Sequence, residues 1–93
     1  MAKIQETRNM SGKPAGEIYE AILKATPTAG FEVWKRRDIA WLVMVRRSEG
    51  VIDGSVSVSP GGQVIVAVNA PGMTEAEVNA LAETYFKAIE AAL

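Results

Sequence analysis

Apolar and polar residues alternate with a two-residue period through the middle of the chain, which is typical of strands with one buried face. At the centre of this region is a run of seven apolar residues, 39–45, which lies between Arg37-Asp38 and Arg46-Arg47. The β-branched content and short length of the run favour a strand covered on both faces over a buried helix segment. Three further strands are expected at 31–36, 51–59 and 63–69.

The strongest turn signal of the chain is Pro60-Gly61-Gly62. A two-residue loop here would place Val58 opposite Gln63. The valines of the two strands would then lie on different sides of the sheet. A three-residue loop instead pairs Val58 with Val64 and requires a positive φ, which Gly62 supplies. The sequence therefore predicts the three-residue loop.

A second loop is expected at Glu49-Gly50. A two-residue loop at this position pairs Val43 with Val56 and Val45 with Gly54. Both loop lengths place the same set of apolar residues on one side of the sheet. This agreement predicts a four-stranded antiparallel meander. Its apolar side, the valine-rich face, is predicted to carry Trp34, Ile39, Trp41, Val43, Val45, Val56, Val58, Val64, Val66 and Val68.

A helix is expected from residue 15 to about residue 25, because Ile18, Ile22 and Ala25 share one face. The pair Thr26-Pro27 is expected to end it, since a residue before proline avoids the α region. Residues 1–10 alternate only weakly, and are interpreted as an edge strand or a frayed N-terminus.

A second helix is expected from about residue 75 to residue 93. It begins with a capping box, in which Thr74 and Glu77 satisfy the free N–H groups of the first turn. One stripe at helical spacing is apolar and is predicted to face the sheet. The stripe consists of Val78, Leu81, Ala82, Tyr85, Ile89 and Leu93.

The expected order of elements is (β)-α-β-β-β-β-α, in a single domain that spans residues 1–93. With both helices on the valine-rich face of an antiparallel four- or five-stranded sheet, this order gives a two-layer α+β sandwich. In element order alone, the chain resembles a trimmed helix-grip domain, the fold of START-like lipid-binding proteins. No function and no site residue is taken from this resemblance.

The chain contains neither cysteine nor histidine. Disulfides, Cys-ligated clusters, the usual zinc sites, Cys nucleophiles and His general bases are therefore excluded. Because no other catalytic constellation is recognisable, we expect a protein that is not an enzyme and that holds no metal and no cofactor. No segment has the pattern of a signal peptide or a membrane span, so the expectation is a cytoplasmic protein without a membrane partner.

Basic residues are clustered at Lys35-Arg36-Arg37 and at Arg46-Arg47. A hairpin that turns near Asp38 places these clusters at opposite ends, so they do not form one stripe. The net charge is −1, and no exposed aromatic platform is interleaved with the basic residues. We therefore interpret the clusters as solubilising charge and expect no nucleic-acid partner.

The face of the sheet opposite the valine-rich face is expected to lack a covering element. By alternation, it is predicted to present Phe31, Val33, Leu42, Met44 and Ile65. Burying a side chain of this size stabilises by roughly 1.5–3 kcal/mol, so several together are comparable with the stability of a small domain. We expect a homodimer interface here, or a surface for another protein. The alternative is that scattered apolar residues on a solvent-facing side have no such role.

A second hypothesis uses the space between the sheet and the helices. In it, Trp34 and Trp41 form the wall of a pocket for a small apolar ligand, and Tyr19 or Tyr85 provides a polar contact. The alternative is ordinary core packing, which the many valines and alanines favour.

Overall fold

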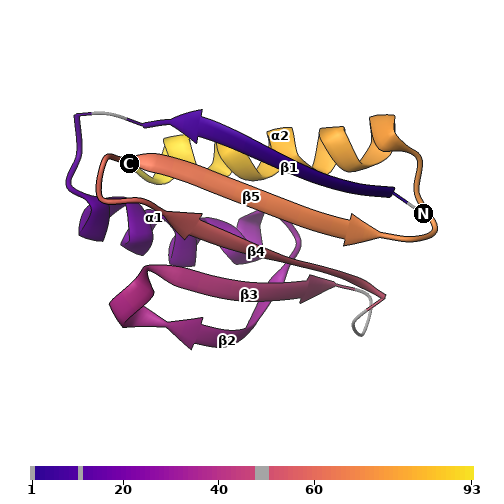
Figure 1. The fold of residues 1–93 in the computed structure, drawn as a ribbon, viewed down its shortest axis with the longest axis horizontal. Helices are drawn as coiled ribbons and strands as arrows, with labels where there is room; N and C mark the ends of the chain where they lie inside the picture. The colour runs from indigo at the N-terminus through magenta and orange to yellow at the C-terminus, as the bar shows by residue number, and fades with distance from the viewer. Residues whose placement is uncertain (1, 11, 48–50) are drawn as a thin grey trace.

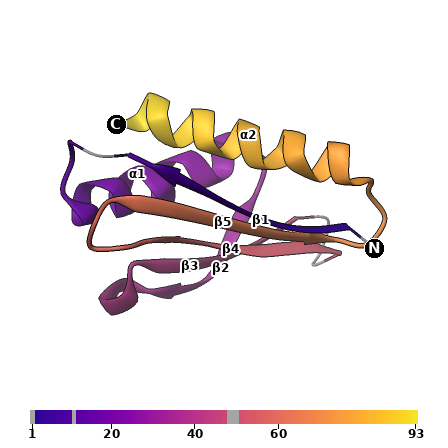
Figure 2. The ribbon, with the colours of Figure 1, turned by 45° about the horizontal axis from the view of Figure 1, so that its top comes forward.

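Five antiparallel strands form one sheet in the spatial order β1-β5-β4-β3-β2 (Figure 1). The computed structural model describes residues 2–10, 12–47 and 51–93. The elements are, in chain order, β1 (Ala2–Asn9), α1 (Ala15–Thr28), β2 (Glu32–Arg37), the 3₁₀ helix η1 (Asp38–Ala40), β3 (Leu42–Arg47), β4 (Ile52–Val58), β5 (Gln63–Ala70) and α2 (Glu75–Ala92). Both helices lie on one side of the sheet (Figure 2), which confirms the predicted α+β sandwich.

The N-terminal segment is the fifth strand of the sheet. β1 pairs with β5 along its whole length, from Ala2 opposite Ala70 to Asn9 opposite Gln63. The side chain of Arg8 on β1 reaches α2, where its guanidinium lies 4.4 Å from the centre of the Phe86 ring. Strand pairing and this contact hold the segment, so its prediction as an edge strand is confirmed over the described residues.

The predicted register of β4 and β5 is confirmed. Val58 pairs with Val64, and Val56 pairs with Val66. Gly62 has a φ of 85°, as the three-residue loop requires.

The register predicted for β3 and β4 is confirmed as well, since Val43 pairs with Val56 and Val45 with Gly54. The residues of the predicted loop between them, Glu49 and Gly50, lie outside the described part of the chain.

The core lies between the valine-rich face and the two helices. Its largest fully buried side chains are Tyr85, Phe86, Ile18, Ile22, Ile89, Val43, Val45, Val56, Val64, Val66, Val78 and Thr26. Helix α1 continues to Thr28, beyond its predicted end, with Pro27 in its last turn. A proline this close to the C-terminus removes only one hydrogen bond of the helix, so the helix can include it.

The run 39–45 is not one strand, contrary to the prediction. Its first residues form η1, Trp41 has left-handed dihedral angles with a φ of 50°, and β3 begins only at Leu42. As a result, Ile39 does not face the core, and its side chain is fully exposed (102%). An unbroken run of apolar residues cannot distinguish a strand from a tight turn followed by a shorter strand.

The prediction that Phe31 and Val33 lie on the side of the sheet opposite the valine-rich face is wrong. Val33 pairs with Val45 and so lies on the valine-rich face, while Phe31 is only 4% exposed and its ring centre lies 5.5 Å from that of Tyr85. The physical reason is a bulge between Val33 and Lys35, which inserts Trp34 and reverses the alternation of β2.

Candidate functional site

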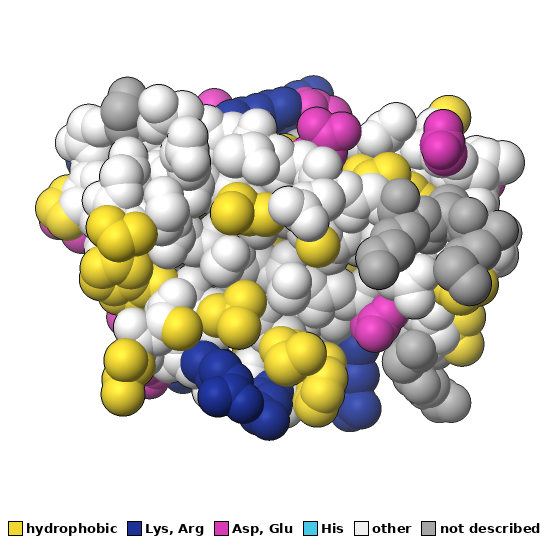
Figure 3. Space-filling model, in the orientation of Figure 1, with side chains coloured by type: hydrophobic (Ala, Val, Ile, Leu, Met, Phe, Trp, Pro, Cys, Tyr) yellow, Lys and Arg dark blue, Asp and Glu magenta, His cyan; other side chains and the backbone are white. Residues whose placement is uncertain are grey.

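Three of the predicted interface residues lie on the side of the sheet opposite the helices. Leu42 pairs with Ser57 and Met44 with Ser55, and both apolar side chains are half-buried. Ile65 on β5 pairs with Ser57 from the other side and is also half-buried. We call the surface formed by Leu42, Met44, Ser55, Ser57, Ile65 and Ala67 the open face. It is seen from the front in Figure 3, where apolar side chains are separated by polar and backbone atoms.

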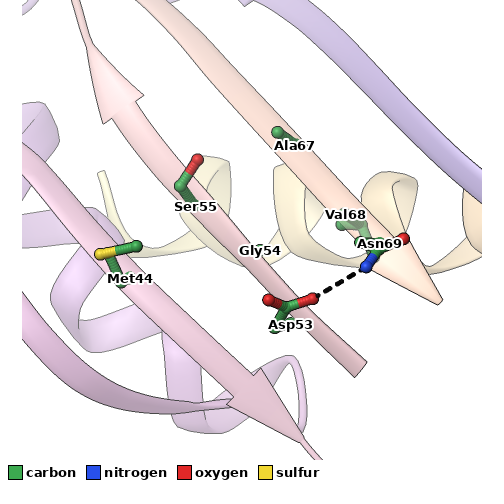
Figure 4. Close-up of a pocket in the computed structure, with 7 residues that line it drawn as sticks. All are labelled: Met44, Asp53, Gly54, Ser55, Ala67, Val68 and Asn69. Carbon is green, nitrogen blue, oxygen red and sulfur yellow. Dashed lines mark hydrogen bonds between the residues drawn. The ribbon is translucent and has the colours of Figure 1, made fainter. Parts of the chain in front are cut away.

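A shallow depression of about 360 Å³ lies on the open face (Figure 4). Its lining residues are Met44, Asp53, Gly54, Ser55, Ala67, Val68 and Asn69. In this view Gly54 lies among the longer side chains of Met44, Asp53 and Asn69, and the short side chains of Ser55 and Ala67 lie along the other side.

Gly54 allows β4 and β5 to approach closely beneath this depression. A Cβ atom at this position would lie 2.2 Å from the carbonyl oxygen of Ala67, far inside contact distance. No other residue fits there without a shift of the neighbouring backbone.

The polar groups of the depression include the side chains of Asp53 and Asn69. The Asn69 Nδ2 donates to Asp53 Oδ1 at 3.3 Å, and the buried Asn69 Oδ1 has no partner among the described residues. An amide oxygen of this kind can accept a hydrogen bond from a donor on a partner molecule. The described residues contain no group of three or more acidic, His or Cys side chains that could hold a metal ion.

The aromatic residues predicted to line a ligand pocket are in separate environments. Tyr85 is in the core, where its hydroxyl group is hydrogen bonded to that of Thr26, and burial raises its pKa to about 12. The ring of Tyr19 is buried and its hydroxyl points to Asp38, whereas Trp34 is 48% exposed and Trp41 is half-buried. None of these four residues lines the depression on the open face or the second depression, which lies between Asn9, Met10, Lys13, Glu90 and Leu93.

A second surface, which the sequence analysis missed, lies at the connection between β2 and β3. Ile39 and Ala40 are exposed there, Trp41 is half-exposed, and Trp34 is exposed on the bulge of the edge strand β2 that leads to this connection; we call these four residues the apolar tip. Asp38 indicates a turn, as the sequence analysis expected, but no local residue indicates that the turn extends through Ala40 to Trp41.

Two hydrogen-bonded contacts hold the base of the apolar tip. The Tyr19 hydroxyl donates to Asp38 Oδ1 at 2.6 Å, and Arg36 Nε donates to the same oxygen at 3.2 Å. Both donors favour the ionised carboxylate, so the pKa of Asp38 is lowered, first by Tyr19 and then by Arg36. The pKa of Tyr19 is raised by burial and by its bond to Asp38.

Basic side chains surround the apolar tip. Lys35, Arg36 and Arg37 are exposed, and Asp38 is the one acidic residue between 34 and 41. Arg46 lies at the far end of β3, where it forms an ion pair with Glu32 at 2.7 Å. The two basic clusters are therefore at opposite ends of the hairpin, as predicted.

The fold and these two surfaces define a small α+β domain with apolar groups at its surface. No protein-family model matches the sequence, and no curated protein is significantly similar to it. No helix among the described residues is long and apolar enough to cross a bilayer.

Proposed function

We propose that the chain is a non-enzymatic interaction domain that forms a homodimer through its open face. The observation that carries this proposal is the partial exposure of Leu42, Met44 and Ile65, which are half-buried on the side of the sheet that neither α1 nor α2 covers. Apolar side chains on a sheet face that no other element covers often mark a surface that binds another protein.

The dimensions of the sheet are compatible with a stable interface. The molecule measures 35 × 23 × 19 Å along its principal axes, and the open face is parallel to the two longer ones. Their product of about 800 Å² is an upper limit for the area of this side of the molecule, and it equals roughly the area each partner contributes to an interface of standard size.

The composition of the open face supports packing of one sheet against another. Ser55, Ser57 and Ala67 are short, so that a second sheet can approach to the distance of about 10 Å usual for stacked sheets. In a two-fold arrangement, Met44 of each copy can enter the depression of the other, because both copies present the same surface. Lys35 and Asp53 provide charges of both signs at its margin, as interface rims commonly do.

The non-enzymatic part of the proposal is based on the absence of His and Cys from the sequence. Ser55 also lines the depression, but its hydroxyl forms no hydrogen bond with a base among the described residues, and Asp53 and Asn69 are hydrogen bonded to each other. Binding through shape and apolar contact requires neither a nucleophile nor a base.

The test is the molar mass in solution, measured by light scattering on a sizing column from about 1 to 500 µM. A dimer is expected for the wild type, and Met44→Ser and Leu42→Ser should shift it toward the monomer by at least tenfold in dissociation constant. Ile39→Ser removes an equally apolar side chain outside the open face, and should leave the dimer unchanged. A wild-type monomer at every concentration, or an equal effect of Ile39→Ser, contradicts the proposal.

A further inference from the structure

The apolar tip presents the most exposed large apolar side chain described in this protein. Ile39 is fully accessible at the turn, and Trp34 is 48% exposed on the bulge of β2, the strand that leads to this turn. Trp41 and Ala40 complete an apolar surface at one end of the sheet, outside the open face. Neither helix covers this end of the hairpin (Figure 1).

The tip is held in one conformation rather than left free to fold back. Trp41 adopts a φ of 50° and a ψ of 48°, a conformation that bulky residues rarely adopt. Its carbonyl accepts a hydrogen bond from the N–H of Val58 at 3.1 Å, and its N–H donates to the backbone carbonyl of Asp38 at 3.2 Å. With Tyr19 fixing the Asp38 side chain, the backbone keeps Ile39 pointed outward.

The charge around the tip has the opposite sign to that of the whole chain. The protein carries a net charge of −1, with ten basic and eleven acidic residues. Three of the ten basic residues are Lys35, Arg36 and Arg37, and Asp38 compensates one of them. Lys35 and Arg37 pair with Met44 and Leu42, so both emerge on the same side of β2.

We propose that the apolar tip binds reversibly to the surface of an anionic phospholipid bilayer. Ile39 and Trp34 enter the interfacial region, where tryptophan is favoured, and Lys35 and Arg37 contact lipid phosphates. Stable attachment to a membrane surface requires both an apolar and an electrostatic signal, and the tip combines the two. The proposal extends beyond the dimer and does not depend on it, since Ile39 lies outside the open face; Lys35 and Arg37, which pair with Met44 and Leu42, lie at the margin of that face.

The two tryptophans of the chain make this proposal directly measurable. Both are in the tip, so that intrinsic fluorescence reports on this surface alone. Addition of vesicles containing 30% phosphatidylserine in phosphatidylcholine is expected to shift the emission to shorter wavelength and to sediment the protein. Pure phosphatidylcholine vesicles should bind at least tenfold more weakly, and 0.5 M NaCl should release most of the protein.

Variants separate the two contributions. Ile39→Ser should weaken binding to the anionic vesicles by about tenfold or more, whereas Val51→Ser, an exposed apolar control, should not. The double variant Lys35→Glu with Arg37→Glu should abolish binding. Its charge-matched control, Lys24→Glu with Lys87→Glu on the two helices, should retain it.

Three results would overturn the proposal. The first is no binding of the wild type to anionic vesicles at low salt. The second is sedimentation without a shift in emission, or equal losses in Ile39→Ser and Val51→Ser, since either would place the contact elsewhere. The third is a shift in emission with single-stranded oligonucleotides and none with vesicles, which would assign the basic tip to nucleic acid instead.

Discussion

The hydroxyl groups of Thr26 and Tyr85 are hydrogen bonded to each other in the interior of the protein, and join α1 to α2. The Thr26 hydroxyl also donates to the carbonyl of Ile22 at 2.7 Å. Because that bond uses the single hydroxyl proton of Thr26, Tyr85 must be the donor to Thr26. Thr26 is the buried polar residue of the core, and this arrangement satisfies it fully.

The pKa of Tyr85, raised to about 12 by burial, makes stability depend on alkaline pH. The unfolded chain ionises this phenol near its ordinary value of about 10, so it binds fewer protons than the folded chain between the two values. Stability is thus complete below about pH 10 and falls as pH rises. Between pH 8 and pH 11, we expect Tyr85 to account for a loss of about 1.4 kcal/mol.

Urea unfolding of the wild type and Tyr85→Phe at the two pH values measures this loss. The variant should be less stable by about 1 kcal/mol at pH 8, because it lacks one hydrogen bond, and should lose less stability at pH 11. Both proteins contain the same lysines and Tyr19, so that their contributions cancel in the comparison. Parallel losses in the two proteins would show that the ring is accessible to water.

Gly54 and Gly16 are expected to respond in opposite directions to the same substitution. Gly54→Ala places a methyl group against the carbonyl of Ala67 and should destabilise by about 2–3 kcal/mol. Gly16 is exposed on α1 with open space around it, so Gly16→Ala should stabilise by about 0.5–1 kcal/mol. Urea denaturation curves of the two variants check this, and a tolerated Gly54→Ala would mean that β4 and β5 can separate locally.

The capping box of α2 predicts that removing the Thr74 side chain lowers the free energy of unfolding. Glu77 N–H donates to Thr74 Oγ1 at 3.2 Å, and Thr74 N–H donates to Glu77 Oε1 at 3.0 Å. Thr74→Ala should therefore destabilise by about 1 kcal/mol. Thr84→Ala, in the middle of the same helix, is the control and should be neutral or slightly stabilising.

The stabilisation that the Glu77 carboxylate gives to the capping box should depend on pH in the acid range. The hydrogen bonds from Thr74 lower the pKa of Glu77, so its contribution is present above the ordinary pKa of a glutamate and disappears as pH falls through the lowered value. The difference in stability between the wild type and Glu77→Gln should therefore vanish in acid. Thermal unfolding at pH 7 and at pH 2 measures it, and an equal difference at both values would exclude a role of the charge.

Asp38 is expected to titrate below the ordinary range of an aspartate. Its pKa is lowered by the Tyr19 hydroxyl and by Arg36, so Tyr19→Phe should raise it toward its ordinary value. Carboxyl chemical shifts followed by NMR during an acid titration measure the change. Tyr85→Phe, which removes a hydroxyl from the core, should leave the titration of Asp38 unaltered.

The sequence predicted β4 and β5 well, because local chemistry determines them. Gly62 requires one loop length, that length requires one register, and the register places Val56 and Val66 on the same face. Leu42, Met44 and Ile65 were therefore assigned correctly to the opposite side, since they lie on strands whose alternation is unbroken. Whether this face binds a second copy depends on how well the two surfaces fit each other, and a local sequence pattern does not determine that fit.

The prediction failed between β2 and β3 because nonlocal contacts decide the backbone there. The turn at Asp38 is held by Tyr19, which comes from α1, and an aspartate beside arginine gives no local indication of this partner. The bulge at Trp34 likewise lacks a glycine or a proline that would reveal it. One inserted residue and one left-handed residue were enough to move Phe31 into the core and Ile39 out of it.

The pairing of β1 with β5 has a consequence for synthesis on the ribosome. The partners of residues 2–9 are residues 63–70, so the nascent segment must wait while the intervening chain is made. At a translation rate of about 5–20 residues per second, this delay is on the order of seconds. During it, β1 has no strand to join, and the sheet is closed by a late contact between distant parts of the chain. Ribosome-associated chaperones would therefore meet this segment before its partner strand exists.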